Sequence, residues 1–463
     1  MEFLQQLYQW IWGVPTLILM IFVGLYFSLR TGFAQLRLLP NALRRFFSRM
    51  TSTKEAGTGI SSFQALCTAL AATVGTGNLA GVAGALAIGG PGAIFWMWIC
   101  GLLGMVIKFA EATLAISYRT KNATGEWVGG PMYMICLGLP KGFRPLASMY
   151  AFCGVVAACG VGNATQINTV IASVSHTAAS FGWALSLWGK LLLGALLAVL
   201  IGAMLLDGAK GIGRAAEVLV PFAAALYLLL GTVVLIARWQ VIPDAFSAIV
   251  RGAFSPRAVT GGMVGSVLTV MRTGISRGVF TNEAGMGTAS IAHASAAVEH
   301  PVEQGMMGIV EVFLDTIVIC TMTALVILVS GVPVGYGIDA DIGLTTAAFA
   351  HVLGPWVRVV ITLSLCLFAV ATVLGWGLYG LRCAQFLFGT SAWKTFVYLQ
   401  ILTIVFGSVM ETKMIWLLAE IINGLMAIPN LIALGALSPQ LSTIYKNYLY
   451  GGTYENFNQC QSL

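Results

Sequence analysis

The centre of the second long apolar run reads Ala72-Thr73-Val74-Gly75-Thr76-Gly77-Asn78. No Asp, Glu, Lys or Arg occurs from residue 56 to residue 107. A stretch this long and apolar spans a bilayer as a helix, because lipid offers the backbone no hydrogen-bond partners. Gly75 and Gly77 allow dihedral angles that a continuous helix does not use, and polar residues cluster beside them. The segment therefore predicts a spanning helix that is broken at its centre, rather than glycines that serve only close helix packing.

The whole composition agrees with a lipid environment. The chain has 463 residues, of which 58% are hydrophobic and 9% charged, whereas soluble domains carry about 25% charged residues. This excludes a soluble enzyme, a DNA-binding module and a disordered scaffold, and it predicts an all-α polytopic membrane protein. About eleven runs are long enough to span, approximately at residues 10–29, 61–89, 92–118, 147–178, 184–206, 214–237, 260–297, 304–330, 357–388, 393–409 and 413–437.

Lysine and arginine are unevenly distributed over the loops, and positively charged loops stay in the cytoplasm. The richer set contains Arg30, Arg37, Arg44, Arg45, Arg49, Lys54, Arg119, Lys121, Lys141, Arg144, Lys210, Arg214, Lys394 and Lys446. The opposite set contains Arg238, Arg251, Arg257 and Lys413. We therefore expect a bacterial or archaeal inner-membrane protein with its N-terminus outside and its C-terminus in the cytoplasm. These loop charges explain the net charge of +7 without a nucleic-acid partner.

The chain repeats itself at one constant separation, at which Asn78–Gly81 corresponds to Asn282–Gly285. The same separation pairs Gly101 with Gly305, Phe109 with Phe313 and Glu111 with Asp315. The matching runs are the second and the seventh, which differ by five, an odd number. They therefore cross in opposite directions, as in the inverted repeats of secondary transporters. We expect helices 2–6 and 7–11 to form the two repeats, each with a broken first helix. The predicted boundaries are an extra helix and basic cytoplasmic loop at 1–59, repeats at 60–240 and 258–440, and a cytoplasmic tail at 441–463.

A break inside the membrane exposes two kinds of backbone group. N–H groups at the start of the second half-helix suit a carboxylate, and carbonyls at the end of the first suit a dehydrated Na⁺. Thr73 and Asn78 can add side-chain oxygens. The break therefore predicts a site for a carboxylate and a cation.

The corresponding run of the second repeat contains Arg272, Arg277 and Glu283, which are costly inside a membrane and must face protein, water or each other. Gly274 and Gly278 are the expected break points in this run. We interpret the arginines as structural pairs, since a small zwitterion does not require them. A role as gate or ligand stays open.

Ala164-Thr165-Gln166 of the first repeat resembles Ala371-Thr372-Val373 of the second, so Gln166 and Thr372 lie in corresponding segments. A Thr hydroxyl can complete a Na⁺ shell, Gln can orient a ligand amine, and Trp376 can form the wall of a small pocket. Each of these residues alone is equally explained by an interhelical hydrogen bond or by packing. Their corresponding positions in the two repeats favour a shared site.

Four segments resemble one known family, the alanine or glycine:cation symporters. They are Ala72–Ala83, Gly129–Tyr133, Ser276–Ala289 and Thr372–Trp376. The resemblance extends from about residue 60 to residue 437. That family is similar in architecture to the bacterial leucine transporter and the neurotransmitter:sodium symporters, which implies five-plus-five inverted repeats. It also implies Na⁺-coupled uptake of small neutral amino acids, chiefly alanine and glycine, by alternating access, with Na⁺ as coupling ion and no other cofactor.

Residue by residue, the resemblance implies a substrate site formed by Thr73, Gly75, Thr76, Gly77, Asn78, Gln166, Thr372, Val373 and Trp376. It implies that the backbone carbonyls of Ala71 and Val74 and the hydroxyl of Thr372 bind Na⁺. Ala371 departs from the pattern, because related symporters often place a second hydroxyl ligand at this position.

Other functions stay open at this point. A proton-coupled amino-acid permease would use Glu111, Asp315 or Glu283 as its proton carrier, although we interpret Glu111 and Asp315 first as structural counter-ions. An intramembrane enzyme lacks support, since the histidines form no set with the spacing of metal ligands.

Overall fold

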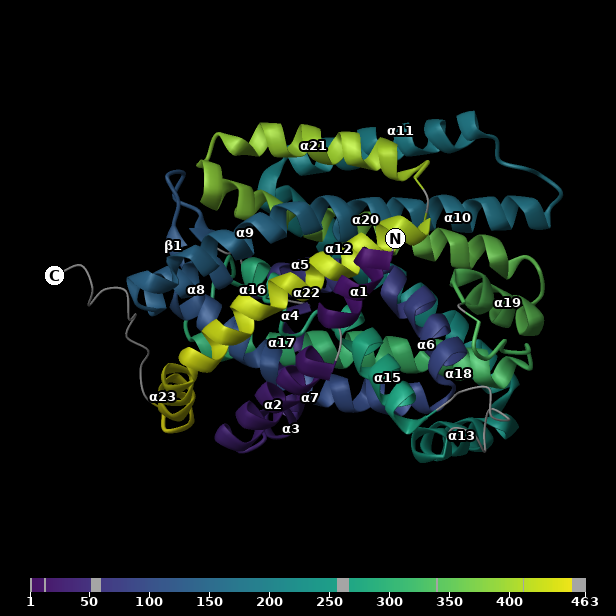
Figure 1. The fold of residues 1–463 in the computed structure, drawn as a ribbon, viewed down its shortest axis with the longest axis horizontal. Helices are drawn as coiled ribbons and strands as arrows, with labels where there is room; N and C mark the ends of the chain where they lie inside the picture. Colours follow the sequence, from purple (N-terminus) through teal and green to yellow (C-terminus); the bar gives the residue numbers. More distant parts are fainter. Residues whose placement is uncertain are drawn as a thin grey trace.

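The computed structural model describes residues 2–11, 14–50, 60–255, 266–338, 340–410 and 412–451. Nearly all of this part is helical, and its one sheet pairs β1 (Thr120–Lys121) with β2 (Trp127–Val128). The long helices pack into one body in which segments far apart in sequence, such as α11 (Leu187–Leu206) and α21 (Ala392–Gly407), lie side by side (Figure 1). The predicted all-α class is confirmed.

The remaining elements follow in chain order. The N-terminal group consists of α1 (Glu2–Ile11), α2 (Val14–Arg30), α3 (Ala34–Arg37) and α4 (Leu39–Met50). The next group consists of α5 (Ser62–Thr73), η1 (Gly77–Gly81), α6 (Val82–Gly89), α7 (Gly92–Ser117), α8 (Pro131–Gly138), η2 (Lys141–Phe143), α9 (Arg144–Cys159), η3 (Gly160–Ala164), α10 (Thr165–Ser180), α12 (Gly208–Ala237), η4 (Trp239–Val241) and α13 (Ile242–Phe254). The last group consists of α15 (Val267–Asn282), α16 (Thr288–His293), α17 (Pro301–Val312), η5 (Phe313–Cys320), α18 (Thr321–Ser330), α19 (Ile342–Leu353), α20 (Val357–Phe388), α22 (Thr412–Ala436) and α23 (Ser438–Leu449).

By length and composition, 6 helices of the described part can cross a membrane, or up to 8 if each bent helix pair is one span. Three shorter apolar helices, Leu17–Arg30, Ile342–Leu353 and Ala392–Gly407, fall below that length. The chain is therefore multi-pass, while the number of eleven crossings stays a prediction.

The first broken helix lies where the sequence predicts it. A capping box of Ser61 and Gln64 starts α5, and the helix ends at Thr73. Val74 then has an extended backbone, with ψ of 97°. The chain resumes in the π-helical turn η1 and in α6, which is bent by 49° from α5.

The second break lies elsewhere than the sequence predicts. Helix α15 runs without interruption past Gly274 and Gly278, so the expectation that these glycines break it is wrong. Both lie against α7 instead, and a Cβ on Gly278 would come within 2.9 Å of Cys100 Cβ. The chain leaves the helix at Glu283, and Glu283, Gly285 and Gly287 all have positive φ angles, of 53°, 86° and 76°. Left-handed backbone at three nearby positions, not glycine alone, ends α15.

The structure of α15 also argues against a hydrolase motif in this segment. Residues 274–278 match the G-x-S-x-G letters of hydrolases, but that motif requires its serine on a sharp turn between strand and helix. Ser276 lies inside the continuous helix α15.

Corresponding helices of the two predicted repeats pack against each other. Helix α7 packs on α17, α9 on α20, and α11 on α21. The two broken helices lie among these pairs. Helix α5, the first half of the first broken helix, packs mainly on α12 and α20.

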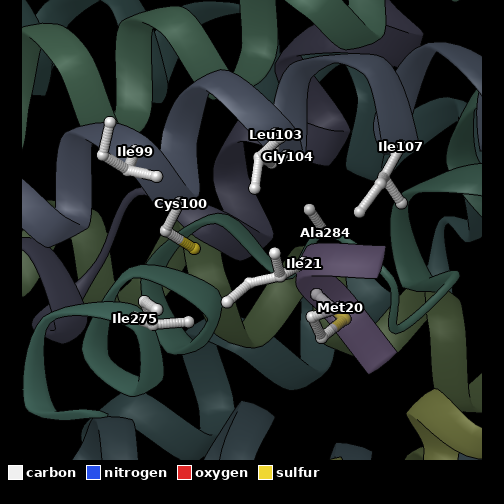
Figure 2. Close-up of a pocket in the computed structure, with 9 residues that line it drawn as sticks. All are labelled: Met20, Ile21, Ile99, Cys100, Leu103, Gly104, Ile107, Ile275 and Ala284. Carbon is white, nitrogen blue, oxygen red and sulfur yellow. The ribbon is translucent and has the colours of Figure 1, made fainter. Parts of the chain in front are cut away.

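The extra N-terminal helix α2 supports the second break. It packs on α7 and α15, and Figure 2 shows the small apolar pocket between them, with Met20 and Ile21 facing Cys100, Ile275 and Ala284. A Cβ on Gly285, in the break itself, would lie 2.6 Å from Met20 Sδ. The helix that precedes the repeats is therefore part of the packing around the broken segment.

Candidate functional site

The end of α5 leaves backbone groups without their usual helical partners. In a continuous helix the N–H of Gly75 would donate to the carbonyl of Ala71. Here it donates to Asn78 Oδ1 at 2.9 Å, and the last regular bond is from Val74 N to the carbonyl of Leu70, at 2.8 Å. The carbonyl of Ala71 and the extended residue Val74 thus lie at a half-helix C-terminus, where partial negative charge accumulates.

Side chains from two other helices meet this break. A Cβ on Gly75 would lie 2.6 Å from the Thr372 hydroxyl oxygen and 3.4 Å from Gln166 Oε1. Thr372 is on α20 and Gln166 is on α10, so the structure brings together three of the residues that the sequence places in one site. Helix α20 can approach so closely because residue 375 is also glycine, and a Cβ there would lie 2.8 Å from Ala72 N.

Two oxygens at this junction are buried and have no hydrogen-bond partner in the described part of the chain: Thr76 Oγ1 and Gln166 Oε1. The amide nitrogen of Gln166 donates to the carbonyl of Val161 at 3.3 Å, which turns the oxygen away from that carbonyl. An unsatisfied buried polar atom costs about 1–3 kcal/mol, so such atoms are expected where a ligand supplies the partner.

Trp376 stands one turn after Thr372 and is 1% exposed. Its side chain covers the backbone of Gly162, where a Cβ would collide with it, and Gly162 stands one turn before Gln166. Val373, on the same helix, is fully buried. Trp376 therefore borders the same junction of α10 and α20 that holds Gln166 and Thr372.

Thr73, Gly77 and Asn78 have contacts away from Gln166 and Thr372, and Asn78 in addition accepts from Gly75 N–H through its Oδ1. The hydroxyl of Thr73 donates back to the carbonyl of Ala69 at 3.3 Å. A Cβ on Gly77 would meet Thr281 Cγ2 at 3.2 Å, on the second broken helix. The amide nitrogen of Asn78 donates to Asp315 Oδ1 at 2.7 Å. The structure thus divides the predicted set: Gly75, Gln166 and Thr372 meet directly, while Gly77 and Asn78 join the first break to the second repeat.

Two carboxylates hold the breaks in a reciprocal way. Asp315, of the second repeat, accepts from Asn78 in the first break. Glu111, of the first repeat, accepts from the N–H groups of Gly285 and Gly287 in the second break, at 2.9 and 3.1 Å. Both acids are fully buried. These contacts give them a structural role, as the sequence interpretation of structural counter-ions expects, but the donors here are neutral amides and not cations. Their matching positions were visible in the sequence, but their partners were not.

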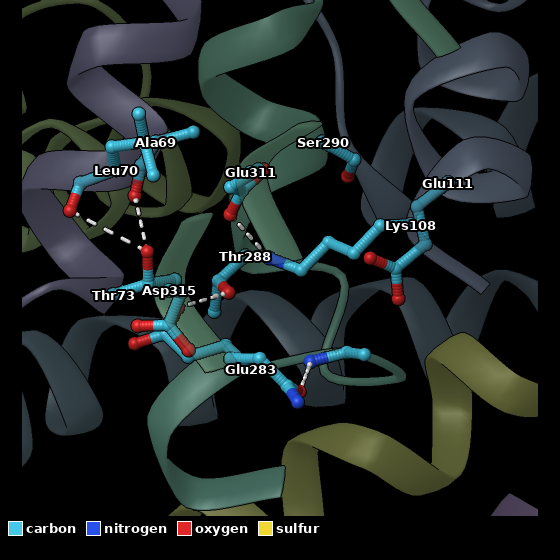
Figure 3. Close-up of polar contacts among 12 residues, drawn as sticks. Ala69, Leu70, Thr73, Lys108, Glu111, Glu283, Thr288, Ser290, Glu311 and Asp315 are labelled. Atoms are coloured by element: carbon cyan, nitrogen blue, oxygen red, sulfur yellow. Dashed lines mark hydrogen bonds and ion pairs between the residues drawn. The ribbon is translucent and has the colours of Figure 1, made fainter. Parts of the chain in front are cut away.

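The structure also contains a buried row of hydrogen-bonded polar side chains that the sequence did not lead us to predict. Lys108 Nζ lies 2.8 Å from Glu311 Oε1, and Glu311 Oε2 lies 3.0 Å from His293 Nε2. The chain continues through Gln304 to Ser62, which is the first residue of α5. Figure 3 shows Lys108 and Glu311 beside Glu111 and Glu283. The available signal was Lys108 and Glu311 themselves, since charges in apolar runs rarely occur without a partner.

The sequence matches one known family over almost its whole length. The model of the sodium:alanine symporter family matches residues 1–456. The chain belongs to the sodium:alanine symporter family. Among its relatives, the sodium/alanine symporter AgcS of Methanococcus maripaludis is 43% identical over 431 residues, which is 92% of each chain. A transporter of Haemophilus influenzae is 42% identical over 453 residues, which is 97% of this chain and 96% of the relative.

Solved structures support the fold independently. The crystal structure of MhsT in complex with L-phenylalanine matches with a TM-score of 0.52 at 14% identity, and the match covers 84% of this chain and 89% of that one. At this identity the likeness concerns the fold alone, and it is the leucine-transporter type of fold that the resemblance implied. Membership of the symporter family makes this chain a transporter in the cell membrane, not an enzyme, and it supports Na⁺-coupled amino-acid symport.

Proposed function

We propose that this symporter carries alanine and glycine into the cell together with Na⁺. The observation that carries the proposal is the meeting of Gly75, Thr372 and Gln166 at the first break, with unpartnered buried oxygens beside them. The space near Gly75 is already too tight for a Cβ, and Trp376 closes on Gly162 nearby. A site with such close walls favours the smallest amino acids.

The same break supports the cation part of the proposal. The carbonyls of Ala71 and Val74 lie at the end of α5, and the hydroxyl of Thr372 lies next to Gly75. Oxygen atoms of this kind suit a hard cation. These three residues would bind Na⁺, and the N–H groups that begin η1, together with Thr76 and Gln166, would bind the amino acid. The ion would then supply a positive charge next to the substrate carboxylate.

Transport would proceed by alternating access, with the N-terminus outside and the C-terminus in the cytoplasm. Helix α5 packs on α12 and α20, whereas α6 packs on α7, α15 and α18. The two halves of the broken helix thus pack against different sets of helices. Opening one side would separate α5 from α20, and opening the other would move α6.

Uptake into proteoliposomes tests the coupling ion. We expect labelled alanine to accumulate against its gradient when Na⁺ is outside and to do so poorly when K⁺ replaces Na⁺ at equal pH on both sides. Unlabelled glycine should compete with the label. Equal uptake in Na⁺ and K⁺ would contradict Na⁺ coupling, and a failure of both amino acids to compete would contradict the substrate assignment.

A proton-coupled permease stays the alternative. Its candidate carriers are Glu111, Glu283 and Asp315, and each of them accepts hydrogen bonds at one of the breaks. This arrangement favours a structural role over proton exchange. Uptake driven by a pH gradient in the absence of Na⁺ would favour the alternative.

A further inference from the structure

Glu283 occupies an unusual place in the second break. Among the described residues, it is one of two non-glycine residues with positive φ, the other being Phe33. Its side chain is 3% exposed, and its two oxygens have different partners. Oε1 accepts from the indole N–H of Trp376 at 2.9 Å, and Oε2 accepts from the hydroxyl of Thr288 at 2.6 Å. A residue in the break of one helix thus holds a side chain of α20.

Trp376 is fixed from three sides. Its side chain lies against the Gly162 backbone, its ring meets Tyr379 edge to face at 5.7 Å between centroids, and its N–H is bound by Glu283. The atoms nearest to Gly162 are Cβ, Cγ and Cδ2, at the root of the side chain, whereas Glu283 binds the N–H on the edge of the ring. The bond to Glu283 therefore selects one orientation of the ring.

We propose that Glu283 is a positioning residue that sets the size of the amino acid the carrier accepts, by holding the indole of Trp376 in one orientation beside Gly162. This rests on the proposed function, in which Trp376 borders the amino-acid site. Glu283 acts in this role as a two-oxygen hydrogen-bond acceptor and not as a charge. A glutamine can keep the bond to Trp376 through its amide oxygen, and its amide nitrogen can donate to the Thr288 hydroxyl.

The test compares Glu283→Ala with Glu283→Gln in proteoliposomes. The readout is the concentration of unlabelled alanine, 2-aminobutyrate, valine or leucine that halves the uptake of labelled alanine. We expect Glu283→Ala to reduce the preference for alanine over leucine at least tenfold, because the indole is released. Glu283→Gln should keep most of this preference. Glu299→Ala, which removes an exposed glutamate, is the matched control and should change neither uptake nor preference.

A double-mutant cycle tests whether Glu283 acts through the indole. Trp376→Phe keeps an aromatic wall but has no N–H to donate. In that background, Glu283→Ala should add no further change in preference. A further change of tenfold, or an equal loss of preference in Glu283→Gln and Glu283→Ala, would overturn the proposal, and so would an unchanged preference in Glu283→Ala.

These outcomes are separable from a failure of the proposed function. If wild-type protein does not carry alanine, the proposed function fails and the same competition series is run with the amino acid that it does carry. If Glu283→Ala does not fold, Glu283→Gln and Trp376→Phe still decide: the proposal requires the first to keep the size preference and the second to weaken it.

Discussion

At the scale of single residues, the site depends on how little space the glycines leave. Gly75 allows Thr372 and Gln166 to reach the broken backbone, and Gly375 allows α20 to reach α5. These glycines do not have positive φ. Their role is close approach, whereas Gly285 and Gly287 provide backbone angles that other residues rarely adopt.

Gly75→Ala should reduce alanine uptake by about 5–150-fold, because the new Cβ would lie 2.6 Å from Thr372 Oγ1. Overpacking of this kind costs about 1–3 kcal/mol, and 1.4 kcal/mol corresponds to a factor of ten. Gly81→Ala is the matched control, since nothing lies within 4 Å of a Cβ at that position. Initial rates of labelled alanine uptake, corrected for the amount of reconstituted protein, measure both variants. Equal rates in the two would show that Gly75 is not crowded in the working carrier.

At the scale of elements, each broken helix is held by a carboxylate of the other repeat. Glu111 Oε1 accepts two backbone N–H groups and the amide of Asn430, which lies 2.7 Å away on α22. Asp315 has the corresponding role at the first break. An unwound segment lacks the regular backbone ladder of a helix, so these acceptors from the other repeat help to keep its shape.

Glu111→Ala should destabilise the protein by about 3 kcal/mol, since it leaves several buried donors unpaired. Glu111→Gln keeps one acceptor oxygen and should restore most of the loss. Thermal unfolding in detergent gives the comparison, with Glu299→Ala as an exposed control. A glutamine variant as unstable as the alanine variant would mean that the charge itself is required.

The elements also explain how far sequence reasoning reaches. The first break could be predicted because Gly75 and Gly77 coincide with Thr73, Thr76 and Asn78 in an uncharged run. The second could not be placed, since a packing glycine and a break glycine look identical in sequence. Gly278 serves packing, and the deciding feature is the left-handed backbone of Glu283, a residue with no intrinsic preference for that shape.

The predicted site divides for a similar reason. Gln166 and Thr372 could be paired from their corresponding positions in the repeats, and the structure brings both to Gly75. The turn of Asn78 toward Asp315 could not be foreseen, because it depends on how the two repeats cross. The internal repeat carries information about position but not about which side chain faces which helix.

At the scale of the whole molecule, the proposed substrate site and the proposed ion site share one segment. The proposed Na⁺ ligands Ala71 and Val74 end α5, and the proposed substrate donors begin η1, only a few residues later. A ligand that orders this segment for itself also orders it for the other. We therefore expect strong coupling between the two binding events.

Equilibrium binding of labelled alanine, repeated at several Na⁺ concentrations, should show alanine affinity rising with Na⁺. A titration with Na⁺ at several alanine concentrations should give a rise in Na⁺ affinity by the same factor, because coupling free energy is reciprocal. A coupling of 1–3 kcal/mol, which is about 5–150-fold, is typical. Alanine affinity that does not depend on Na⁺ would place the two sites apart.

Each break is bound by a carboxylate of the other repeat, and this arrangement has a consequence for biogenesis. While the ribosome is still making the second half, the amide of Asn78 has no Asp315 to receive it, so the first break is incomplete in the membrane. The second break, in turn, binds the carboxylate of Glu111, which is part of a helix made much earlier. Neither half of the chain carries all the partners of its own broken helix. Maturation of this symporter therefore ends only when the late helices dock onto the early ones, and the interval before docking is when quality-control proteases in the membrane would find an unfinished protein.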